Sequence, residues 1–230
     1  MTQQLPLPLV LSPRYRFETF VAARRNQALL AHLSSLTTAS PEKLWIWGQS
    51  GAGKTHLLQA TCAAQAERRA MYLMLREPDE LDPGVLDGLE GLDLVALDDI
   101  DRVLGSVPWE RALFKLLDAA QQDRASVVMS ASSPPAAASF GLADLASRAA
   151  AAAVYELEPL ADAERVLALQ RHARARGLEL PDEAADYLLK RVRRDMAGLC
   201  EWLEALDAAS LAAQRKLTIP LIRRTLSERA

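Results

Sequence analysis

The chain has 230 residues, 50% of them hydrophobic, and its formal net charge at pH 7 is −3. This length allows one α/β domain of ordinary size and a small second domain. No continuous apolar run could span a bilayer, and the N-terminus lacks the basic-then-apolar order of a secretory signal, so we expect a cytoplasmic protein that does not enter a membrane. The slightly negative net charge argues against a protein whose whole surface binds nucleic acid. We therefore expect contact with DNA to be weak or indirect.

The first part of the chain predicts a tail followed by alternating helices and strands. Residues 1–13 contain three prolines and no charged side chain, which is typical of an extended segment. A first helix is expected over Arg25–Leu36. Short apolar strands are predicted at Leu44–Trp47, Ala70–Leu75, Leu92–Leu97, Ser126–Ser130 and Ala153–Leu157. This alternation indicates a five-stranded parallel sheet covered on both faces, and the stretch Glu77–Leu92 could be a loop or a surface for a partner.

From Asp162 onward the strand pattern disappears. Helices are predicted over Ala161–Arg176, from Pro181, after Asp195 as a capping residue, and from Thr218. The expected organisation is a tail (residues 1–13), an α/β domain (14–159) and a small all-α lid domain (160–230).

The cysteines and histidines offer no metal or catalytic pattern. Cys62 and Cys200 lie far apart, without metal-ligand spacing or a redox C-x-x-C, which predicts two buried free thiols. His32, His56 and His172 form neither a ligand set nor a triad spacing.

Residues 48–55 fit the phosphate-loop pattern G-x-x-x-x-G-K-[ST]. The loop consists of Gly48, Gln49, Ser50, Gly51, Ala52, Gly53, Lys54 and Thr55. Its glycines let backbone N–H groups converge on phosphate oxygens, Lys54 can reach the β and γ phosphates, and the Thr55 hydroxyl can ligate Mg²⁺. An apolar strand enters the loop and a helix leaves it, so the positive end of that helix faces the anion. The sequence therefore predicts a site for a nucleoside di- or triphosphate with Mg²⁺.

Two carboxylates end the third predicted strand. Asp98 is placed to hold the Mg²⁺ shell, and Asp99 could orient an attacking water. A solvated turn is the alternative for both residues. Asp101 is expected to cap the next helix.

Two later segments could also touch phosphates. Ser130 or Ser132 could sense the γ-phosphate or a water, because ligands gather at the carboxyl ends of parallel strands, and an ordinary loop serine is the alternative. Arg148 could complete a nucleotide site on a neighbouring molecule and stabilise transition-state charge there. A solvated arginine is the alternative for Arg148.

The order of these motifs resembles the AAA+ domain of the DnaA family of bacterial replication initiators. The shared features are the phosphate loop, the Asp-Asp strand end, the hydroxyl-ended strand, the Asp-Leu-x-Ser-Arg segment 144–148 and a helical lid. The resemblance covers almost the whole chain and implies an AAA+ phosphate-loop fold. It also implies that the segment containing Phe20, Val21 and Asn26 closes over the base, with Phe20 and Val21 flanking the adenine.

Further segments extend this resemblance toward a regulator. Arg194 resembles a lid arginine that reaches the phosphates, with a solvated side chain as the alternative. Residues 214–220 resemble the corresponding segment of the Hda family, whose members are related to DnaA and inactivate it. The tail resembles the Gln-Leu-x-Leu-x-Leu peptide that binds the β sliding clamp, whose apolar anchors suit a hydrophobic cleft. The tail residues concerned are Gln4, Leu5, Leu7 and Leu9.

Two departures from the family pattern concern nucleotide sensing. Ala23 stands where a glycine is usual, and Ser132-Ser133 stands where relatives carry Asp-Arg. Loss of that charged pair should weaken sensing of the γ-phosphate, which favours a nucleotide-bound regulator over an efficient ATPase.

The resemblance implies a regulator that binds the sliding clamp on DNA and presents Arg148 to ATP held by DnaA. Hydrolysis of that ATP would prevent re-initiation of chromosome replication. The chain's own loop would then hold a nucleotide, ADP or ATP, with weak or no ATPase activity of its own. A chain that ends after its lid, with no DNA-reading domain, favours this interpretation. An autonomous DNA-dependent AAA+ ATPase or helicase loader, an adaptor without a working arginine, and a homo-oligomer remain open.

Overall fold

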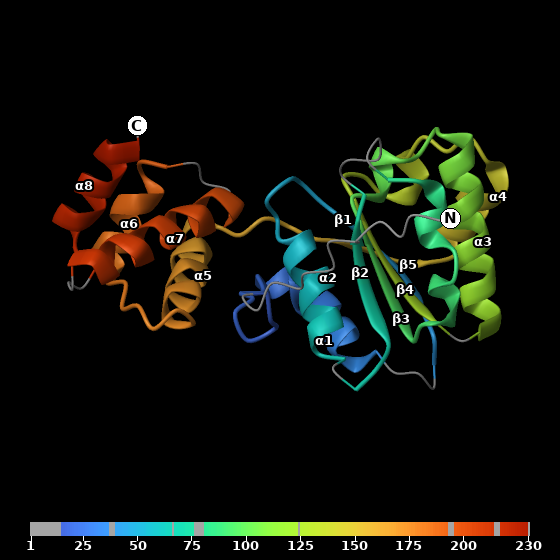
Figure 1. The fold of residues 1–230 in the computed structure, drawn as a ribbon, viewed down its shortest axis with the longest axis horizontal. Helices are drawn as coiled ribbons and strands as arrows, with labels where there is room; N and C mark the ends of the chain where they lie inside the picture. Colours follow the sequence, from blue (N-terminus) through green and yellow to red (C-terminus); the bar gives the residue numbers. More distant parts are fainter. Residues whose placement is uncertain are drawn as a thin grey trace, which may run out of the picture.

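The computed structural model describes residues 15–36, 40–65, 67–75, 81–123, 125–192, 196–213 and 217–229. These residues form an α/β domain and a separate group of helices, which stand beside each other in Figure 1. No helix within these ranges is long and apolar enough to cross a membrane.

One parallel sheet of five strands forms the centre of the first domain, in the order β2-β3-β4-β1-β5. The strands are β1 (Lys43–Trp47), β2 (Ala70–Met74), β3 (Leu94–Asp98), β4 (Ser126–Ala131) and β5 (Ala153–Glu156). They confirm the predicted five-stranded parallel sheet. The third strand starts later than expected because the Leu92 N–H donates to the Leu89 carbonyl in a turn.

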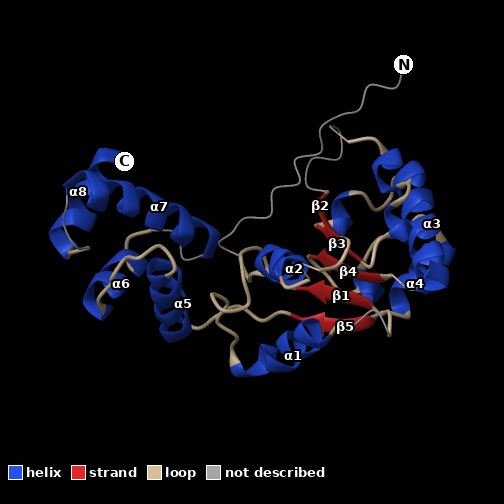
Figure 2. Ribbon diagram, turned by 60° about the horizontal axis from the view of Figure 1, so that its bottom comes forward, coloured by secondary structure: helices blue, strands red, loops and turns tan. Residues whose placement is uncertain are grey.

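Helices cover both faces of this sheet, as Figure 2 shows. One face carries α1 (Gln27–Ser35) and α2 (Lys54–Ala63), and the other carries α3 (Val107–Asp123) and α4 (Ala143–Ala150). Side chains alternate along a strand, so Leu44 and Ile46 pack with α1 and α2 while Trp45 belongs to the opposite core. Strands buried on both faces have nearly continuous apolar sequences, which is why they are predictable.

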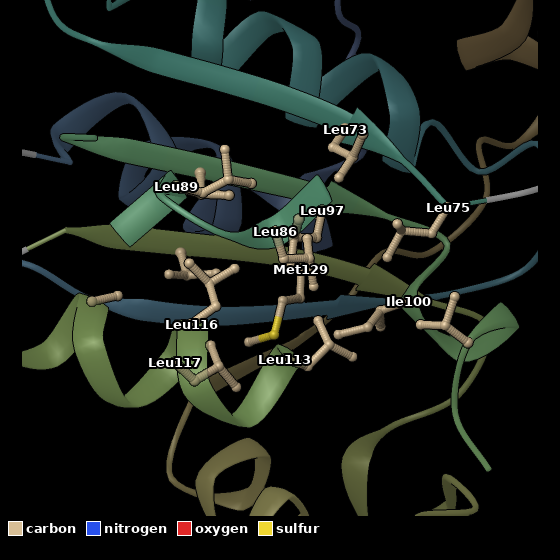
Figure 3. Packing of buried hydrophobic residues seen from close by; sticks show 14 of the residues in the cluster. Leu73, Leu75, Leu86, Leu89, Leu97, Ile100, Leu113, Leu116, Leu117 and Met129 are labelled. Carbon is tan, nitrogen blue, oxygen red and sulfur yellow. The ribbon is translucent and has the colours of Figure 1, made fainter. Parts of the chain in front are cut away.

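The core under α3 is built mainly from leucines (Figure 3). Leu113, Leu116 and Leu117 point from α3 toward Leu97 and Met129 of the sheet, and all five are almost completely buried. Their spacing of three and four residues puts the three leucines on one face of the helix. Burial stabilises each such side chain by about 1.5–3 kcal/mol relative to exposure.

Residues 81–92, the described part of the proline- and glycine-rich stretch, pack against α3. Leu86 and Leu89 lie in the same core, at 2% and 6% exposure. This part is therefore a packed cover rather than an open loop. Within the described residues, the 3-10 turns are η1 (Arg24–Asn26), η3 (Pro83–Leu86), η4 (Leu89–Gly91), η5 (Ile100–Arg102) and η6 (Pro135–Ala137).

The second domain is a bundle of helices with a core of its own. Its helices are α5 (Asp162–Arg174), α6 (Asp182–Leu189), α7 (Met196–Ala213) and α8 (Ile219–Arg229). Leu169, Leu188, Leu203 and Ile222, one from each helix, are fully buried in one cluster. The predicted helical lid is thereby confirmed, although its expected capping residue Asp195 lies outside the described residues.

Candidate functional site

A cleft of about 830 Å³ lies between the α/β domain and the helical domain. Its walls come from the N-terminal segment 15–21, the phosphate loop, the turns after β3 and β4, and residues of α5 and α7. These loops follow the carboxyl ends of the strands, the edge at which parallel sheets bind ligands. The cleft therefore collects most of the residues that the sequence singles out.

The phosphate loop forms one wall of the cleft. Gly51 and Gly53 have φ values of +78° and +108°, a conformation that glycine adopts without strain. A Cβ on Gly53 would lie 3.0 Å from the Phe20 ring, and a Cβ on Gly48 would overlap the carbonyl oxygen of Leu157. Position 48 therefore has no room for a side chain, and at position 53 the positive φ and the Phe20 ring together favour glycine.

Lys54 lies within the loop and is 8% exposed. Its Nζ donates to the carbonyl oxygens of Gly48 at 2.7 Å and Gln49 at 3.3 Å. The same side chain lines the cleft. A phosphate oxygen is a stronger acceptor for an ammonium group than a neutral carbonyl, so the lysine is held where a phosphate could use it.

Asp98 is completely buried at the end of β3 and joins the loop to the sheet. Thr55 Oγ1 donates to Asp98 at 2.7 Å, Tyr72 OH donates at 2.8 Å, and Ser130 Oγ also donates. Burial, together with the Asp98 charge, raises the pKa of Tyr72 above its ordinary value, so this hydroxyl remains a donor. Thr55 and Asp98, the two predicted Mg²⁺ residues, are therefore in direct contact.

The two candidate serines have different roles. Ser130 is buried, accepts from the Asp99 N–H at 3.0 Å and does not line the cleft, so it supports the acidic strand end. Ser132 does line the cleft, and its Oγ donates to Asp101 Oδ2 at 2.5 Å. Only Ser132 is placed for contact with a ligand.

The turn after β3 places Asp99, Asp101 and Arg102 in the cleft wall. Asp99 has a φ of +57°, the only positive value for a non-glycine residue in the described chain, and such strain tends to be retained at functional sites. The expectation that Asp101 caps a helix is wrong, because Asp101 lies inside η5 and α3 begins only at Val107. Arg102 also lines the cleft, although the sequence patterns did not predict it. Its position three residues after Asp99, in the turn that follows β3, could have indicated it.

The predicted base-binding segment lies only partly in the cleft. Phe20 and Val21 line it, each 7% exposed. Asn26 does not line it: Asn26 Nδ2 donates to the Glu158 carbonyl at 2.9 Å, and the Glu158 N–H donates to Asn26 Oδ1 at 3.1 Å. Asn26 thus clamps the connection between β5 and α5, and Arg171 of α5 donates to the Phe20 carbonyl at 3.0 Å.

Two histidines that form no pattern in the sequence meet in the cleft. The ring centroids of His56 on α2 and His172 on α5 are 5.4 Å apart, and both residues line the cleft. His56 Nε2 lies 2.9 Å from the Arg16 carbonyl oxygen, so it donates there. Burial lowers the pKa of each histidine to about 4, so both rings are neutral near pH 7. They are 116 residues apart in the chain, and no local pattern could have indicated the contact.

Cys200 corrects one of the thiol predictions. Cys62 is 3% exposed, and burial raises its pKa to about 12, as expected of an inert thiol. Cys200 is only half-buried and lines the cleft, so the expectation of two buried thiols is wrong for it.

Arg148 lies at the other end of the sheet. It sits on α4, forms an ion pair with Asp118 of α3, and donates to Gln121 Oε1 at 3.1 Å. Lys43 Nζ, at the amino end of β1, donates to the same Gln121 oxygen at 2.8 Å. Arg148 also lies 5.8 Å from the Phe114 ring centroid and is absent from the lining of the cleft. Arg194 and the tail residues Gln4, Leu5, Leu7 and Leu9 lie outside the described residues.

These features define the class of the protein. A five-stranded parallel sheet, a phosphate loop at the head of α2, an acidic strand end bonded to that loop and a helical domain over the cleft are the parts of an AAA+ domain of the phosphate-loop class.

Comparisons with known proteins narrow this class. The family model of the bacterial DnaA ATPase domain matches residues 11–77, and that of the Hda lid domain matches residues 162–226. Domain III of Thermotoga maritima DnaA has a TM-score of 0.79 and 21% identity, over 95% of this chain and 98% of that one. The chain is an AAA+ protein related to DnaA and Hda.

Two further solved structures agree in fold. DnaA bound to AMPPCP and single-stranded DNA has a TM-score of 0.73 and 20% identity, over 95% of this chain and 70% of that one. The Thermotoga maritima RuvB branch migration motor has a TM-score of 0.64 and 17% identity, over 92% and 73%. At sequence identities this low, the similarity shows only that the folds are alike.

Proposed function

We propose that the cleft binds ADP or ATP with Mg²⁺. Residues 48–55 would hold the phosphates, Thr55 and Asp98 would hold the metal, and Phe20 and Val21 would flank the adenine. The contact of 2.7 Å between Thr55 Oγ1 and Asp98 Oδ2 supports this assignment, since Mg²⁺ is usually held by one or two protein oxygens together with substrate phosphates. Bound Mg²⁺ would neutralise charge on the phosphates. The AMPPCP bound to a DnaA of the same fold is consistent with the proposal.

We further propose that the protein stimulates hydrolysis of ATP held by DnaA, with Arg148 acting in trans. The observation that carries this proposal is the distance of Arg148 from the chain's own cleft. Arg148 shares Gln121 with Lys43, the first residue of β1, whereas the phosphate loop follows the last residue of that strand. A five-residue strand spans about 15 Å, so Arg148 cannot serve the nucleotide in its own cleft.

The surroundings of Arg148 suit a group that is offered to another molecule. Its side chain is 34% exposed, and Asp118 and Gln121 hold the guanidinium from one side. An arginine presented in this way can stabilise the charge that develops on a transferring phosphoryl group. The ion pair with Asp118 would be weakened or exchanged for the phosphate on docking, at small cost because it is partly solvated.

The proposal also assigns roles to the N-terminal tail and to Arg194 of the lid. Gln4, Leu5, Leu7 and Leu9 would bind the β sliding clamp, so that the regulator acts where DNA has been replicated and prevents re-initiation in the cytoplasm. Arg194 would reach the phosphates from the lid. The proposed domains are the tail (1–13), the nucleotide-binding domain (14–159) and the lid (160–230).

The test is hydrolysis of ATP pre-bound to DnaA, in the presence of clamp-loaded DNA. The intact protein should accelerate hydrolysis, and both Arg148→Ala and the double variant Leu5→Ala, Leu7→Ala should lose the acceleration. At high protein concentration the tail variant should recover the acceleration, because tethering is then no longer needed, whereas Arg148→Ala should not recover it. No acceleration by the intact protein would overturn the proposal.

A second candidate function is an autonomous DNA-dependent AAA+ ATPase or helicase loader. The position of Asp99 in the cleft favours it, because a carboxylate there can orient an attacking water. In the same assay this candidate predicts turnover of ATP by the purified protein without DnaA, abolished by Asp99→Asn.

A further inference from the structure

Glu110 is a buried carboxylate that does not line the cleft. It lies in the first turn of α3 and is completely buried. Its Oε1 accepts from the Gly105 N–H at 2.7 Å and the Gly141 N–H at 2.8 Å, and its Oε2 accepts from the Leu142 N–H at 2.5 Å. A carboxylate only accepts hydrogen bonds, so three backbone donors suit it.

These bonds fix the start of helix α4. Gly141 and Leu142 are the two residues directly before α4, whereas Gly105 belongs to the turn before α3. A Cβ on Gly141 would lie 3.3 Å from Glu110 Oε2, so glycine lets the backbone approach the carboxylate this closely. The negative charge also lies at the N-terminal end of α4, where the helix dipole favours it. Glu110 therefore determines where α4 begins relative to α3.

The same side of α3 also holds Arg148, near the end of α4. Asp118 pairs with the guanidinium and Gln121 accepts from it. The Phe114 ring centroid lies 5.8 Å from the guanidinium carbon. Positions 110, 114, 118 and 121 follow a spacing of four, four and three, so they form one stripe along α3. This stripe contacts α4 from the residues that precede it as far as Arg148.

We propose that Glu110 is a positioning residue for Arg148, which directs the guanidinium by fixing the start of α4. The inference rests on the proposed action of Arg148 on ATP held by DnaA. An eight-residue helix is not stable by itself, so α4 takes its orientation from its contacts. Asp118 is 36% exposed, and a partly solvated ion pair orients a side chain only weakly. The buried carboxylate supplies the rigid part of the support.

The experiment measures single-turnover hydrolysis of ATP pre-bound to DnaA, with clamp-loaded DNA, at increasing concentrations of the intact protein or a variant. Glu110→Gln keeps the shape of the side chain but replaces one accepting oxygen by an amide nitrogen, so at least one N–H loses its partner. We expect the rate at saturation to fall about 10-fold, because small displacements of a reacting group lower rates strongly. The concentration that gives half of the maximal rate should not change, whereas a residue needed only for docking would change it.

Two further variants separate positioning from loss of stability. Gly141→Ala brings a Cβ against the carboxylate without removing any donor, so it should lower the maximal rate less than Glu110→Gln does. Thr61→Val is the matched control, because Thr61 is completely buried and donates to the Leu57 carbonyl at 2.7 Å within α2, on the opposite face of the sheet. Its maximal rate should equal that of the unmodified chain. Amide hydrogen exchange should become faster in α4 of Glu110→Gln and stay unchanged in α1.

The outcomes separate this inference from the proposed function. A folded Glu110→Gln protein with an undiminished maximal rate, or with unchanged exchange in α4, overturns the inference and leaves the action of Arg148 intact. An equal loss of rate in Thr61→Val also overturns it, because stability would then be the cause. If Glu110→Gln does not fold, an undiminished maximal rate in Gly141→Ala overturns the inference. An unmodified chain that gives no acceleration overturns the proposed function and this inference together.

Discussion

The two ends of the sheet hold their charged groups in different ways. At the carboxyl end, Asp98 is completely buried and accepts from Thr55, Tyr72 and Ser130. At the amino end, Arg148 pairs with Asp118 while the two side chains stay 34% and 36% exposed. A buried carboxylate that accepts three hydrogen bonds is held in one position within its own domain. A half-exposed arginine can be offered to another molecule.

The largest difference should appear in stability. Asp98→Ala leaves the buried hydroxyls of Tyr72 and Ser130 and the half-buried hydroxyl of Thr55 without their acceptor, so we expect the free energy of unfolding to fall by about 3 kcal/mol. Asp118→Ala removes a partly solvated partner and should change it by less than about 1 kcal/mol. Urea denaturation of the two variants measures both effects, and equal losses would contradict the contrast between the two ends.

The second difference concerns nucleotide affinity. Lys54→Ala should weaken MgADP about 50-fold, because it removes a charge-assisted contact to the phosphates. Arg148→Ala should leave the dissociation constant unchanged, since Arg148 does not line the cleft. Titration calorimetry with Lys190→Ala as an exposed-lysine control measures this. A weaker affinity in Arg148→Ala would place that arginine at the chain's own site.

The histidine contact makes the cleft end sensitive to acid. Burial lowers the pKa of His56 and His172 to about 4, whereas an unfolded histidine titrates near 6.5. Between these values the unfolded chain binds more protons than the folded one, so stability falls as the pH falls. We expect a loss of about 3 kcal/mol between pH 6.5 and pH 5, about half of it from each histidine.

The control for this effect is His172→Asn, which removes one of the two titrations. Its stability should depend on pH about half as steeply. Denaturation curves at pH 5, 6 and 7 measure the slope, and a slope that does not change in the variant would rule out the pair as its source.

The smallest effect on activity should come from Asp118, the carboxylate that pairs with Arg148. Asp118→Asn keeps the shape of the side chain but removes its charge, so the guanidinium should be less well oriented. We expect stimulation of DnaA-bound ATP hydrolysis to fall about threefold, with recovery in Asp118→Glu. Nucleotide affinity, measured on the same preparations, should not change.

Local patterns were sufficient to predict the sheet and the loop of residues 48–55 between β1 and α2. Buried parallel strands are continuous apolar runs, and the loop, Asp98 and Asp99 follow strand ends at which ligands gather. The same patterns misassigned Asp101, because its role depends on Ser132, a residue of the neighbouring strand end.

Contacts between distant segments could not be predicted in this way. Asn26 bonds to the backbone of Glu158, 132 residues away, and a side chain in a base-binding segment gives no sign of this clamp. The pairing of His56 with His172 likewise depends on how α5 packs over α2. Such contacts follow from tertiary packing, and a single sequence contains no periodicity that reports them.

The central claim is that nucleotide is held at one end of the sheet while Arg148 acts on another molecule's ATP at the other. The most direct test measures, on the same preparation of Arg148→Ala, its own affinity for MgADP and the single-turnover rate of ATP hydrolysis by DnaA with clamp-loaded DNA. Arg223→Ala, an exposed lid arginine, is the control. The account predicts a stimulated rate about 10³-fold lower with unchanged affinity, the usual contribution of an arginine finger. An unchanged rate, or a rate and an affinity that fall together, would contradict it.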